Sequence, residues 1–200
     1  MHELLLVSQS PRRRELLTEA GYLFRVDSVK LSEIIDKNVN LEDAVSKLAR
    51  EKAEAYLDQH KSLKGQNILV LSADTIVVVE QDVLGKPETK LQAREFLRRL
   101  SGRVHRVLTG IYLSDLSTGR DFRATETTTI TFRTLTEEEI FNYIETGEPM
   151  DKAGAYGIQG LGRDFVSGIK GSWSNVVGLP LELLDRTLLE NNWFVKRVTQ

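Results

Sequence analysis

Short hydrophobic runs alternate with amphipathic segments along this chain, a pattern that is typical of an α/β fold. The segments expected to form strands are uniformly apolar or alternate between apolar and polar residues: 4–7, 22–26, 68–72, 75–79, 83–84, 104–113, 125–132 and 193–198. Those expected to form helices repeat apolar residues at the helical period: 11–20, 41–57, 91–100, 137–146 and 180–189. We therefore predict a mixed, strongly twisted sheet flanked by helices, with two lobes around a cleft, as a single domain over residues 1–200.

Capping residues mark where several of these helices begin. Ser10 and Asn40 each precede a helical segment, and their side chains are suited to accept hydrogen bonds from the first turn. Thr136 and Glu139 have the spacing of a capping box. Residues 154–178 are instead rich in glycine, which indicates loops and short strands that lie close to a ligand or to another stretch of backbone.

The composition excludes several kinds of active site. The chain of 200 residues contains no cysteine, which rules out a disulfide scaffold, a zinc finger and a thiol nucleophile. The three histidines, His2, His60 and His105, are far apart in the sequence, so a polyhistidine metal site is not expected. Chemistry must then rest on carboxylates, cations, hydroxyl groups and the backbone.

Charge and hydropathy indicate which partners the protein binds and where in the cell it is located. A net charge of -2 argues against binding to nucleic acid polymers, which usually requires an excess of Lys and Arg. The first apolar run spans only residues 4–7, and the later runs have the length of a strand, so neither an export signal nor a membrane span is expected. These features predict a cytoplasmic protein with no membrane contact.

The segment S-Q-S-P-R-R-R at 8–14 lies where the first strand leads into a helix. Free backbone N–H groups and the helix dipole attract anions at such a junction. Ser8, Ser10, Arg12 and Arg13 add hydroxyl and guanidinium groups that suit a phosphate. Taken alone, the segment fits an anion site and a solvated basic turn equally well.

Two further segments combine a charged residue with a constrained position. Asp74, in S-A-D-T at 72–75, follows a buried strand, where a carboxylate can bind a metal, take a proton from water or simply cap a turn. Lys86 stands between Gly85 and Pro87, outside the spacing of a P-loop, and would reach a phosphate or stay in solvent.

Other candidates are weaker on their own. Glu33 is a lone acid in an expected loop, and Lys52 lies in E-K-A at 51–53 on a charged helical face. Gln159, in D-K-A-G-A-Y-G-I-Q-G, offers both a donor and acceptors to the edge of a base. Trp173 is expected to pack in the core or at an interface.

Together and in this order, these segments make the chain resemble the Maf family of nucleoside triphosphate pyrophosphatases, also described as septum-formation inhibitor-like proteins. The matching pieces also include L-S-G at 100–102 and N-V-V-G-L-P at 175–180, so the resemblance covers nearly the whole chain. It implies a fold like that of inosine triphosphatase with a nucleotide cleft, and hydrolysis between the α- and β-phosphates. A homodimer is also implied.

The resemblance assigns roles to the candidate residues. Asp74 is the expected base that deprotonates the attacking water, and Glu33 is a metal ligand or a second carboxylate that orients water. The sequence leaves open which of these two acids holds a divalent Mg²⁺ or Mn²⁺ ion, which prefers oxygen ligands. The catalytic set is completed by two lysines, and hydroxyl, guanidinium and amide groups bind the nucleotide: Lys52, Lys86, Ser8, Ser10, Arg12, Arg13, Thr75 and Gln159.

Three positions point to the branch that acts on dTTP and UTP. Arg12, Thr75 and Gln159 match this branch, whereas the branch that acts on 7-methyl-GTP tends to have Trp, Gln and Glu at these positions. The expected enzyme removes excess or modified pyrimidine nucleotides. Two alternatives remain: a pyrophosphatase for 7-methyl-GTP or another modified nucleotide, and a nucleotide-binding regulator of cell division.

Overall fold

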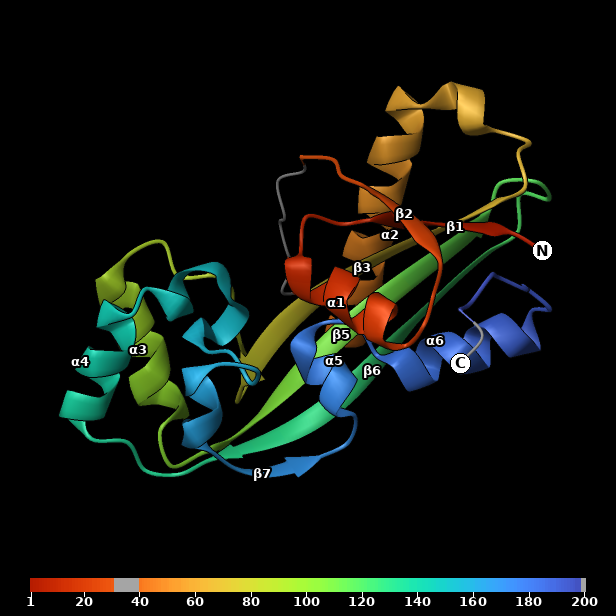
Figure 1. Cartoon of the computed structure of the whole chain (residues 1–200). Coiled ribbons are helices and arrows are strands. Elements are labelled where there is room, and N and C mark those ends of the chain that lie inside the picture. Colours follow the sequence, from red (N-terminus) through yellow and green to blue (C-terminus); the bar gives the residue numbers. More distant parts are fainter. Residues whose placement is uncertain (31–39, 199–200) are drawn as a thin grey trace. The chain divides into compact units, whose positions relative to one another are not determined.

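The computed structural model describes residues 1–30 and 40–198, in which strands and helices alternate (Figure 1). The strands are β1 (Glu3–Val7), β2 (Phe24–Asp27), β3 (Ile68–Val79), β4 (Asp82–Leu84), β5 (Val104–Asp115), β6 (Asp121–Phe132) and β7 (Val166–Lys170). The α-helices are α1 (Pro11–Glu19), α2 (Leu41–Gln59), α3 (Lys90–Leu100), α4 (Glu137–Glu145), α5 (Trp173–Val177) and α6 (Leu181–Glu190). Short 3-10 turns are η1 (Lys61–Leu63), η2 (Glu148–Asp151), η3 (Ala153–Ala155) and η4 (Leu161–Phe165).

The chain divides into two compact units, in agreement with the predicted two lobes. Unit 1 comprises Met1–Asp74, Thr109–Glu126 and Gly178–Gln200, and unit 2 comprises Thr75–Leu108 and Thr127–Val177. Three of the four boundaries fall inside strands, so β3, β5 and β6 each have residues in both units. The nucleotide cleft implied by the resemblance stays a prediction.

The strands form one mixed sheet, as predicted. Its order is β2-β1-β3-β5-β6-β7, and β4 pairs with β3 off this path. Strand β1 is parallel to both β2 and β3, whereas the pairs β3–β4 and β6–β7 are antiparallel. The parallel part belongs to unit 1 and requires crossover helices, which α1 and α2 supply.

The core of unit 1 lies between helix α2 and the sheet. Buried side chains of α2, including Ala49, Ala53 and Tyr56, pack with those of β1 and β3. The helix also approaches strand β5 closely, because a Cβ atom added at Gly110 would lie 2.5 Å from the backbone N of Ser46. Glycine at this position therefore lets the helix backbone contact the strand.

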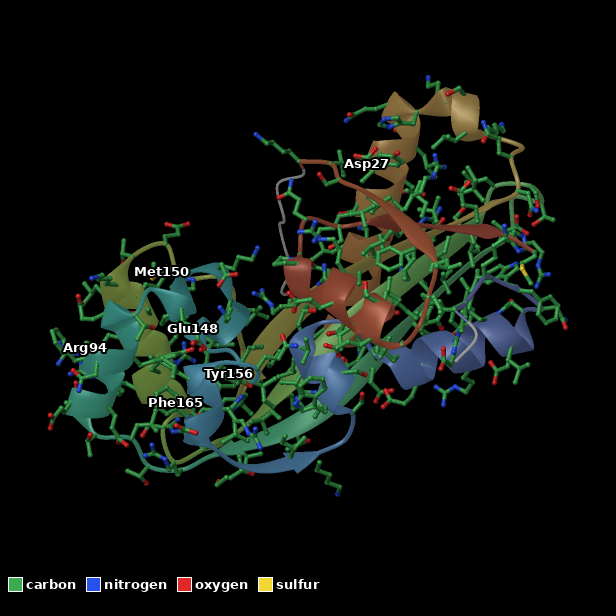
Figure 2. All side chains as sticks on the ribbon, viewed as in Figure 1. Asp27, Arg94, Glu148, Met150, Tyr156 and Phe165 are labelled. Atoms are coloured by element: carbon green, nitrogen blue, oxygen red, sulfur yellow. The ribbon has the colours of Figure 1, made fainter. Side chains whose placement is uncertain are left out.

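The core of unit 2 is built around aromatic rings. Helices α3 and α4 pack against each other (Figure 1), and their apolar faces join a cluster that contains Phe132, Tyr156 and Phe165. Figure 2 shows Tyr156 and Phe165 in this unit. Edge-to-face contacts connect Phe132 with both of them, at ring-centroid distances of 4.7 and 6.0 Å. Such pairs stabilise a core beyond the area that they bury.

A buried histidine makes unit 2 sensitive to acid. His105 is 2% exposed, and its Nε2 lies 2.8 Å from the hydroxyl of Tyr156. Burial lowers its pKa from 6.5 to about 4, because the interior disfavours the charged imidazole. The unfolded chain therefore binds a proton between these pH values that the folded chain does not, and stability falls as the pH drops through this window.

We expect the replacement of His105 with Phe to flatten this pH dependence. The wild-type chain should lose about 3 kcal/mol of unfolding free energy through His105 alone between pH 6.5 and 4. Urea denaturation of both proteins at several pH values measures the difference, and the carboxylates common to both cancel. A variant at His60, which is only partly buried, is the control. Parallel curves for wild type and His105→Phe would contradict the assignment.

Several local expectations are confirmed, and others are wrong. Asn40 caps α2 through its side chain, and Thr136 and Glu139 form the capping box of α4. Ser10 stands at the N-cap of α1, but its side chain does not cap the helix. The strand expected at 193–198 is wrong, because this segment makes only isolated bridges, from Val195 to residue 2 and from Arg197 to residue 22.

The glycine-rich region also departs from expectation. It contains the expected short strand, β7, but also the helix α5 and 3-10 turns, which were not predicted. Trp173, at the start of α5, is 43% exposed and so does not belong to the core. In the described parts of the chain, 1–30 and 40–198, no helix is both long and apolar enough to span a membrane.

Candidate active site

The candidate site of unit 1 begins where β1 and β3 lie side by side. The chain passes from β1 through α1 to β2 on one side, while β3 lies on the other side of β1. The strand order therefore reverses direction between β1 and β3, and ligands of open α/β sheets bind beyond the carboxyl ends of strands at such a point. Val7, the last residue of β1, is paired in register with Ser72 of β3; Ser8 follows the end of β1, and Asp74 lies two residues beyond Ser72, inside β3.

The loop that follows β1 is held by its own side chains. The Oγ atom of Ser8 accepts hydrogen bonds from the backbone N of Ser10 at 3.1 Å and from Nη1 of Arg13 at 3.3 Å. Arg13 is buried, and its Nε donates to the carbonyl of Gly178 at 2.7 Å. Ser10 and Arg12 are partly exposed at the start of α1. Ser8 and Arg13 thus shape the loop.

An acid and a lysine meet on the β3 side of this site. The Nζ of Lys52, on α2, donates to Oδ1 of Asp74 at 2.5 Å, and both side chains are largely buried. Ser72 fixes the helix to the strand, because its Oγ donates to the carbonyl of Ala49 at 2.6 Å. The sequence separation of 22 residues between Lys52 and Asp74 gave no sign of this pair.

The remaining described candidates belong to unit 2. Thr75 is half-buried in β3, whereas Lys86 is exposed in the loop after β4. The carbonyl of Gly85 accepts a hydrogen bond from the N–H of Gly154 at 3.0 Å, which joins the G-K-P loop to the glycine-rich segment. Gln159 is exposed at the end of that segment.

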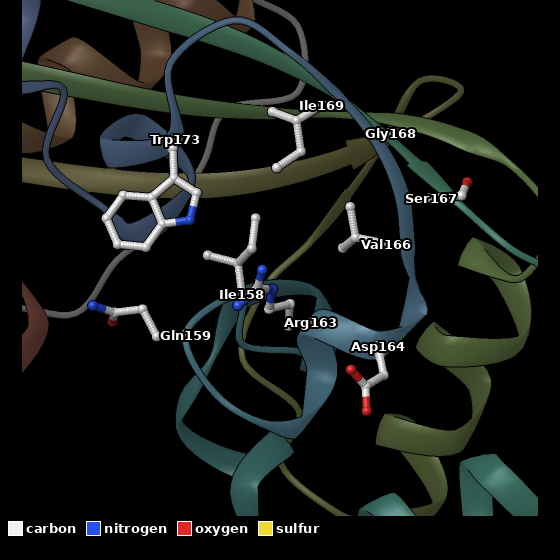
Figure 3. A pocket seen from close by; sticks show the side chains of 9 residues that line it. All are labelled: Ile158, Gln159, Arg163, Asp164, Val166, Ser167, Gly168, Ile169 and Trp173. Atoms are coloured by element: carbon white, nitrogen blue, oxygen red, sulfur yellow. The ribbon is translucent and has the colours of Figure 1, made fainter.

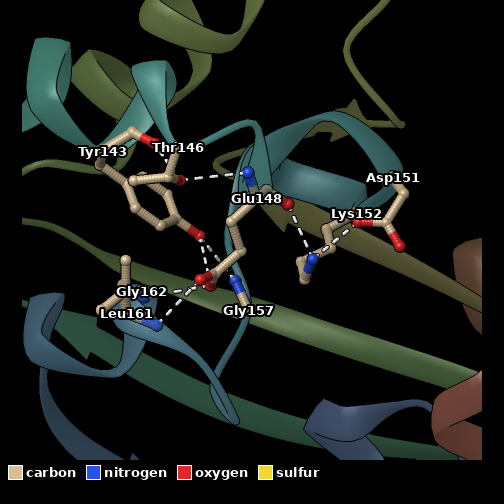
Figure 4. A network of polar contacts seen from close by, with 8 residues as sticks. All are labelled: Tyr143, Thr146, Glu148, Asp151, Lys152, Gly157, Leu161 and Gly162. Atoms are coloured by element: carbon tan, nitrogen blue, oxygen red, sulfur yellow. Dashed lines mark hydrogen bonds and ion pairs between the residues drawn. The ribbon is translucent and has the colours of Figure 1, made fainter.

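The partly buried carboxylate of Glu148 holds the segment around Gln159 in place through hydrogen bonds (Figure 4). The carboxylate of Glu148 accepts hydrogen bonds from the Tyr143 hydroxyl at 2.9 Å, from the N–H of Leu161 at 3.0 Å and from the N–H of Gly162 at 3.3 Å. The Tyr143 hydroxyl in turn accepts from the N–H of Gly157 at 3.1 Å. Backbone on both sides of Gln159 is therefore fixed.

Side chains of the same chain pack closely against the glycines of this segment. A Cβ atom at residue 160 would lie 2.4 Å from a carboxylate oxygen of Glu148, and one at Gly157 would lie 2.6 Å from Cε of Lys152. One at Gly162 would lie 2.7 Å from the Tyr143 hydroxyl. Of the two explanations that the sequence left open, ligand or chain, close packing within the chain accounts for these three glycines.

An open hollow of about 900 Å³ lies beside Gln159 on unit 2 (Figure 3). Ile158, Val166, Ile169 and Trp173 line it together with Gln159. Polar and charged side chains also line it: Arg163, Asp164 and Ser167. A hollow that combines apolar surface with polar groups able to orient a ligand suits a small molecule.

Comparison with known proteins identifies the family. The family model described as "Maf-like protein" matches residues 3–191. This chain belongs to the Maf-like family. Its relatives include proteins named "dTTP/UTP pyrophosphatase" from Bdellovibrio bacteriovorus, 50% identical over 92% of this chain and 96% of the relative, and from a Geobacillus species, 45% identical over 96% and 100%.

A solved structure confirms the fold of this Maf-like chain. The structure of a HAM1 protein from Coxiella burnetii matches with a TM-score of 0.53, covering 95% of this chain and 100% of that protein. Sequence identity between the two is 14%, so the likeness concerns the fold alone. The predicted fold class is therefore confirmed.

The structure brings part of the predicted site together. In unit 1 of the Maf-like chain, Ser8 contacts Arg13, and Lys52 contacts Asp74. Glu33 lies outside the described residues. Among the residues that the structure describes, no three His, Asp or Glu side chains gather where they could hold a metal ion.

Sequence reasoning missed the residues that support the glycine-rich segment. Glu148 and Tyr143 carry no recognisable motif, and their role depends on contacts with residues 13 or 14 positions away that appear only in the fold. The available signal was indirect: a run of glycines needs a neighbour that fills the space left by the absent side chains.

Proposed function

We propose that this Maf-like chain hydrolyses dTTP and UTP to the nucleoside monophosphate and pyrophosphate. One structural observation carries the proposal: the loop 8–13 follows β1, and Asp74, which is bonded to Lys52, lies on β3 just beyond the residues that pair with β1, where the strand order reverses. The relatives named "dTTP/UTP pyrophosphatase" support the choice of reaction and substrate.

The start of α1 is suited to the triphosphate. Backbone N–H groups in the first turn of a helix lack intrahelical partners and attract anions. Ser10 and Arg12 are partly exposed there and would bind phosphate oxygens. Ser8 and Arg13 are buried, so we assign them mainly to the shape of this loop, with their remaining donor capacity directed to the phosphates.

Asp74 would take the proton from the attacking water. The water oxygen then forms a bond to phosphorus as the P–O bond between the α- and β-phosphates breaks, and pyrophosphate leaves. Lys52 holds the carboxylate in position through their hydrogen bond of 2.5 Å, and its positive charge favours developing negative charge on the phosphates. Lys86 would bind the leaving phosphates.

The donor set fits a Mg²⁺ or Mn²⁺ ion that binds together with the substrate. Asp74 supplies one carboxylate, and Glu33 would supply a second; the described residues hold no larger cluster of metal ligands. Mg²⁺ is commonly bound through one or two carboxylates and the substrate's own phosphates. When bound, the ion would neutralise phosphate charge.

Base recognition is assigned to unit 2. Thr75 and Gln159 would bind the pyrimidine, because a wrong base leaves such polar groups unpaired. We also propose a cytoplasmic homodimer that does not bind nucleic acid polymers, as the resemblance and the charge balance suggest.

A panel of nucleotides tests the proposal. Pyrophosphate release should be fastest with dTTP and UTP and slower with CTP, 7-methyl-GTP and the purine triphosphates, and an excess of chelator should abolish it. Each reaction is measured with Mg²⁺ and with Mn²⁺. Preference for 7-methyl-GTP would replace the assigned substrate. Nucleotide binding without any turnover would instead favour a regulatory protein.

A further inference from the structure

The hollow on unit 2 joins an exposed aromatic ring to an exposed amide. Trp173 is 43% exposed, and Gln159 is also exposed; both line the hollow, and Figure 3 shows them on the same side of it. Apolar surface comes from Ile158, Val166 and Ile169. Arg163 and Asp164 add one positive and one negative charge, and Ser167 adds a hydroxyl group. A flat ring with polar edges is the ligand that such a surface accommodates.

The residues that carry Trp173 are held by a buried network. The hydroxyl of Ser172 contacts that of Ser174 at 2.9 Å and accepts a hydrogen bond from the backbone N of Asn175. The amide of Asn175, which is fully buried, donates to the carbonyl of Val107 and to Oγ1 of Thr128. A rigid base therefore presents an indole that the core does not cover.

The residues on either side of Gln159 are also held by hydrogen bonds. Glu148 accepts hydrogen bonds from the N–H groups of Leu161 and Gly162, and Tyr143 accepts from that of Gly157. Gln159 itself makes no side-chain hydrogen bond within residues 1–30 and 40–198. Its amide therefore remains available to a ligand, as both donor and acceptor.

From these observations we propose that the indole of Trp173 stacks on the base of the bound nucleotide, while the amide of Gln159 bonds to the polar edge of that base. This inference rests on the proposed function and adds a residue to it. Aromatic side chains bind bases mainly through the ring face, and because every base has such a face, stacking selects little between bases. The stacking residue thus sets affinity, and the amide selects bases whose edge presents a donor beside an acceptor.

Kinetics of Trp173 variants test the stacking role. We expect Trp173→Ala to raise KM for dTTP about 10-fold with little change in kcat, because a stacking contact is worth roughly 1–3 kcal/mol. Trp173→Phe should restore most of the affinity. The control is Phe141→Ala, which removes another exposed aromatic of unit 2, 59% exposed, from helix α4 and outside the hollow.

Fluorescence gives a readout that a structural role would not change. The chain has two tryptophans, and Trp193→Phe leaves Trp173 as the sole emitter. The buried Trp193 Nε1 has no hydrogen-bond partner in the described chain, so this change breaks no hydrogen bond. Titration with dTMP should quench the emission of Trp173, whereas ribose 5-phosphate, which lacks a base, should not.

The outcomes separate this inference from the proposed function. Wild-type turnover of dTTP together with an unchanged KM in Trp173→Ala would overturn the stacking role and leave the enzyme assignment intact. A loss of dimerisation in Trp173→Ala, measured by analytical ultracentrifugation, with unchanged KM would make this face an interface between two copies and also overturn it. If wild type releases no pyrophosphate from any nucleotide, the proposed function fails, whereas quenching by dTMP would still support the base site.

Discussion

Replacing Asp74 with Asn should lower kcat for pyrophosphate release by about 1,000-fold, within the range that general-base catalysis contributes. An amide has nearly the same shape as the carboxylate but does not accept a proton from water near neutral pH. The Kd for nucleotide should change much less, since Ser10, Arg12 and the start of α1 remain. Initial rates and calorimetric titration with a non-hydrolysable dTTP analogue measure the two quantities.

Because Asp74 forms an ion pair with Lys52, its substitution needs a matched control. Asp74 is 5% exposed and bonded to Lys52, so the substitution also changes a buried ion pair and lowers stability. Asp82→Asn removes a carboxylate from another ion pair, with Arg99 at 2.6 Å, in an exposed position on β4. This control should keep its activity. Turnover in Asp74→Asn equal to wild type, with a folded protein, would remove Asp74 from the mechanism.

The second large effect is expected from Gly110→Ala, which should lower the free energy of unfolding by about 3 kcal/mol, at the upper end of the cost of overpacking. The new methyl group would lie 2.5 Å from the backbone N of Ser46 and from the carbonyl carbon of Val45. Backbone atoms cannot rotate away as a side chain can, so helix α2 must shift. Chemical denaturation monitored by circular dichroism measures the loss.

A second glycine in a strand provides the comparison. A Cβ atom at Gly168, on β7, would meet Thr131 at 3.6 Å, which is an ordinary contact, so Gly168→Ala should stay within about 0.5 kcal/mol of wild type. Because α2 also carries Lys52, Gly110→Ala should reduce kcat as well. A denaturation midpoint of Gly110→Ala equal to that of wild type would show that α2 does not contact β5 so closely.

Local signals explain why most elements were predictable from the sequence. Asn40 and Thr136 cap their helices through contacts within three residues, and the apolar period of residues 41–57 matches a helix that buries one face. The segments at 104–113 and 125–132 became β5 and β6, neighbours in the sheet joined by a short turn. Each of these features depends on chemistry within one segment.

Features that depend on distant partners were not predictable. The segment 193–198 has the composition of a strand, but a strand also needs a continuous partner, and only isolated bridges form. The glycines at 157, 160 and 162 suggested a ligand or neighbouring backbone, whereas the side chains of Glu148, Lys152 and Tyr143 occupy the space.

In the candidate site, too, local features were predictable from the sequence and contacts between distant residues were not. Resemblance supplied the residue types, and the structure added that Arg13 is buried against Gly178, a contact across 165 positions. It also showed that Lys52 is bonded to Asp74 and that Trp173 is exposed beside Gln159. No pattern along a single chain encodes such pairings.

The way the two units share the chain has a consequence for synthesis on the ribosome. Unit 1 begins with β1 but also needs the residues from Gly178 onward, whose carbonyl binds Arg13. Unit 2 is complete once Val177 has emerged. Residues from Gly178 onward are made after unit 2 and complete a unit that began before it, so the loop 8–13 gains its contact with Gly178 only after unit 2 has been made. A nascent chain that ends before residue 178 would carry the hollow on unit 2 but would lack the hydrogen bond that anchors Arg13 in the loop after β1.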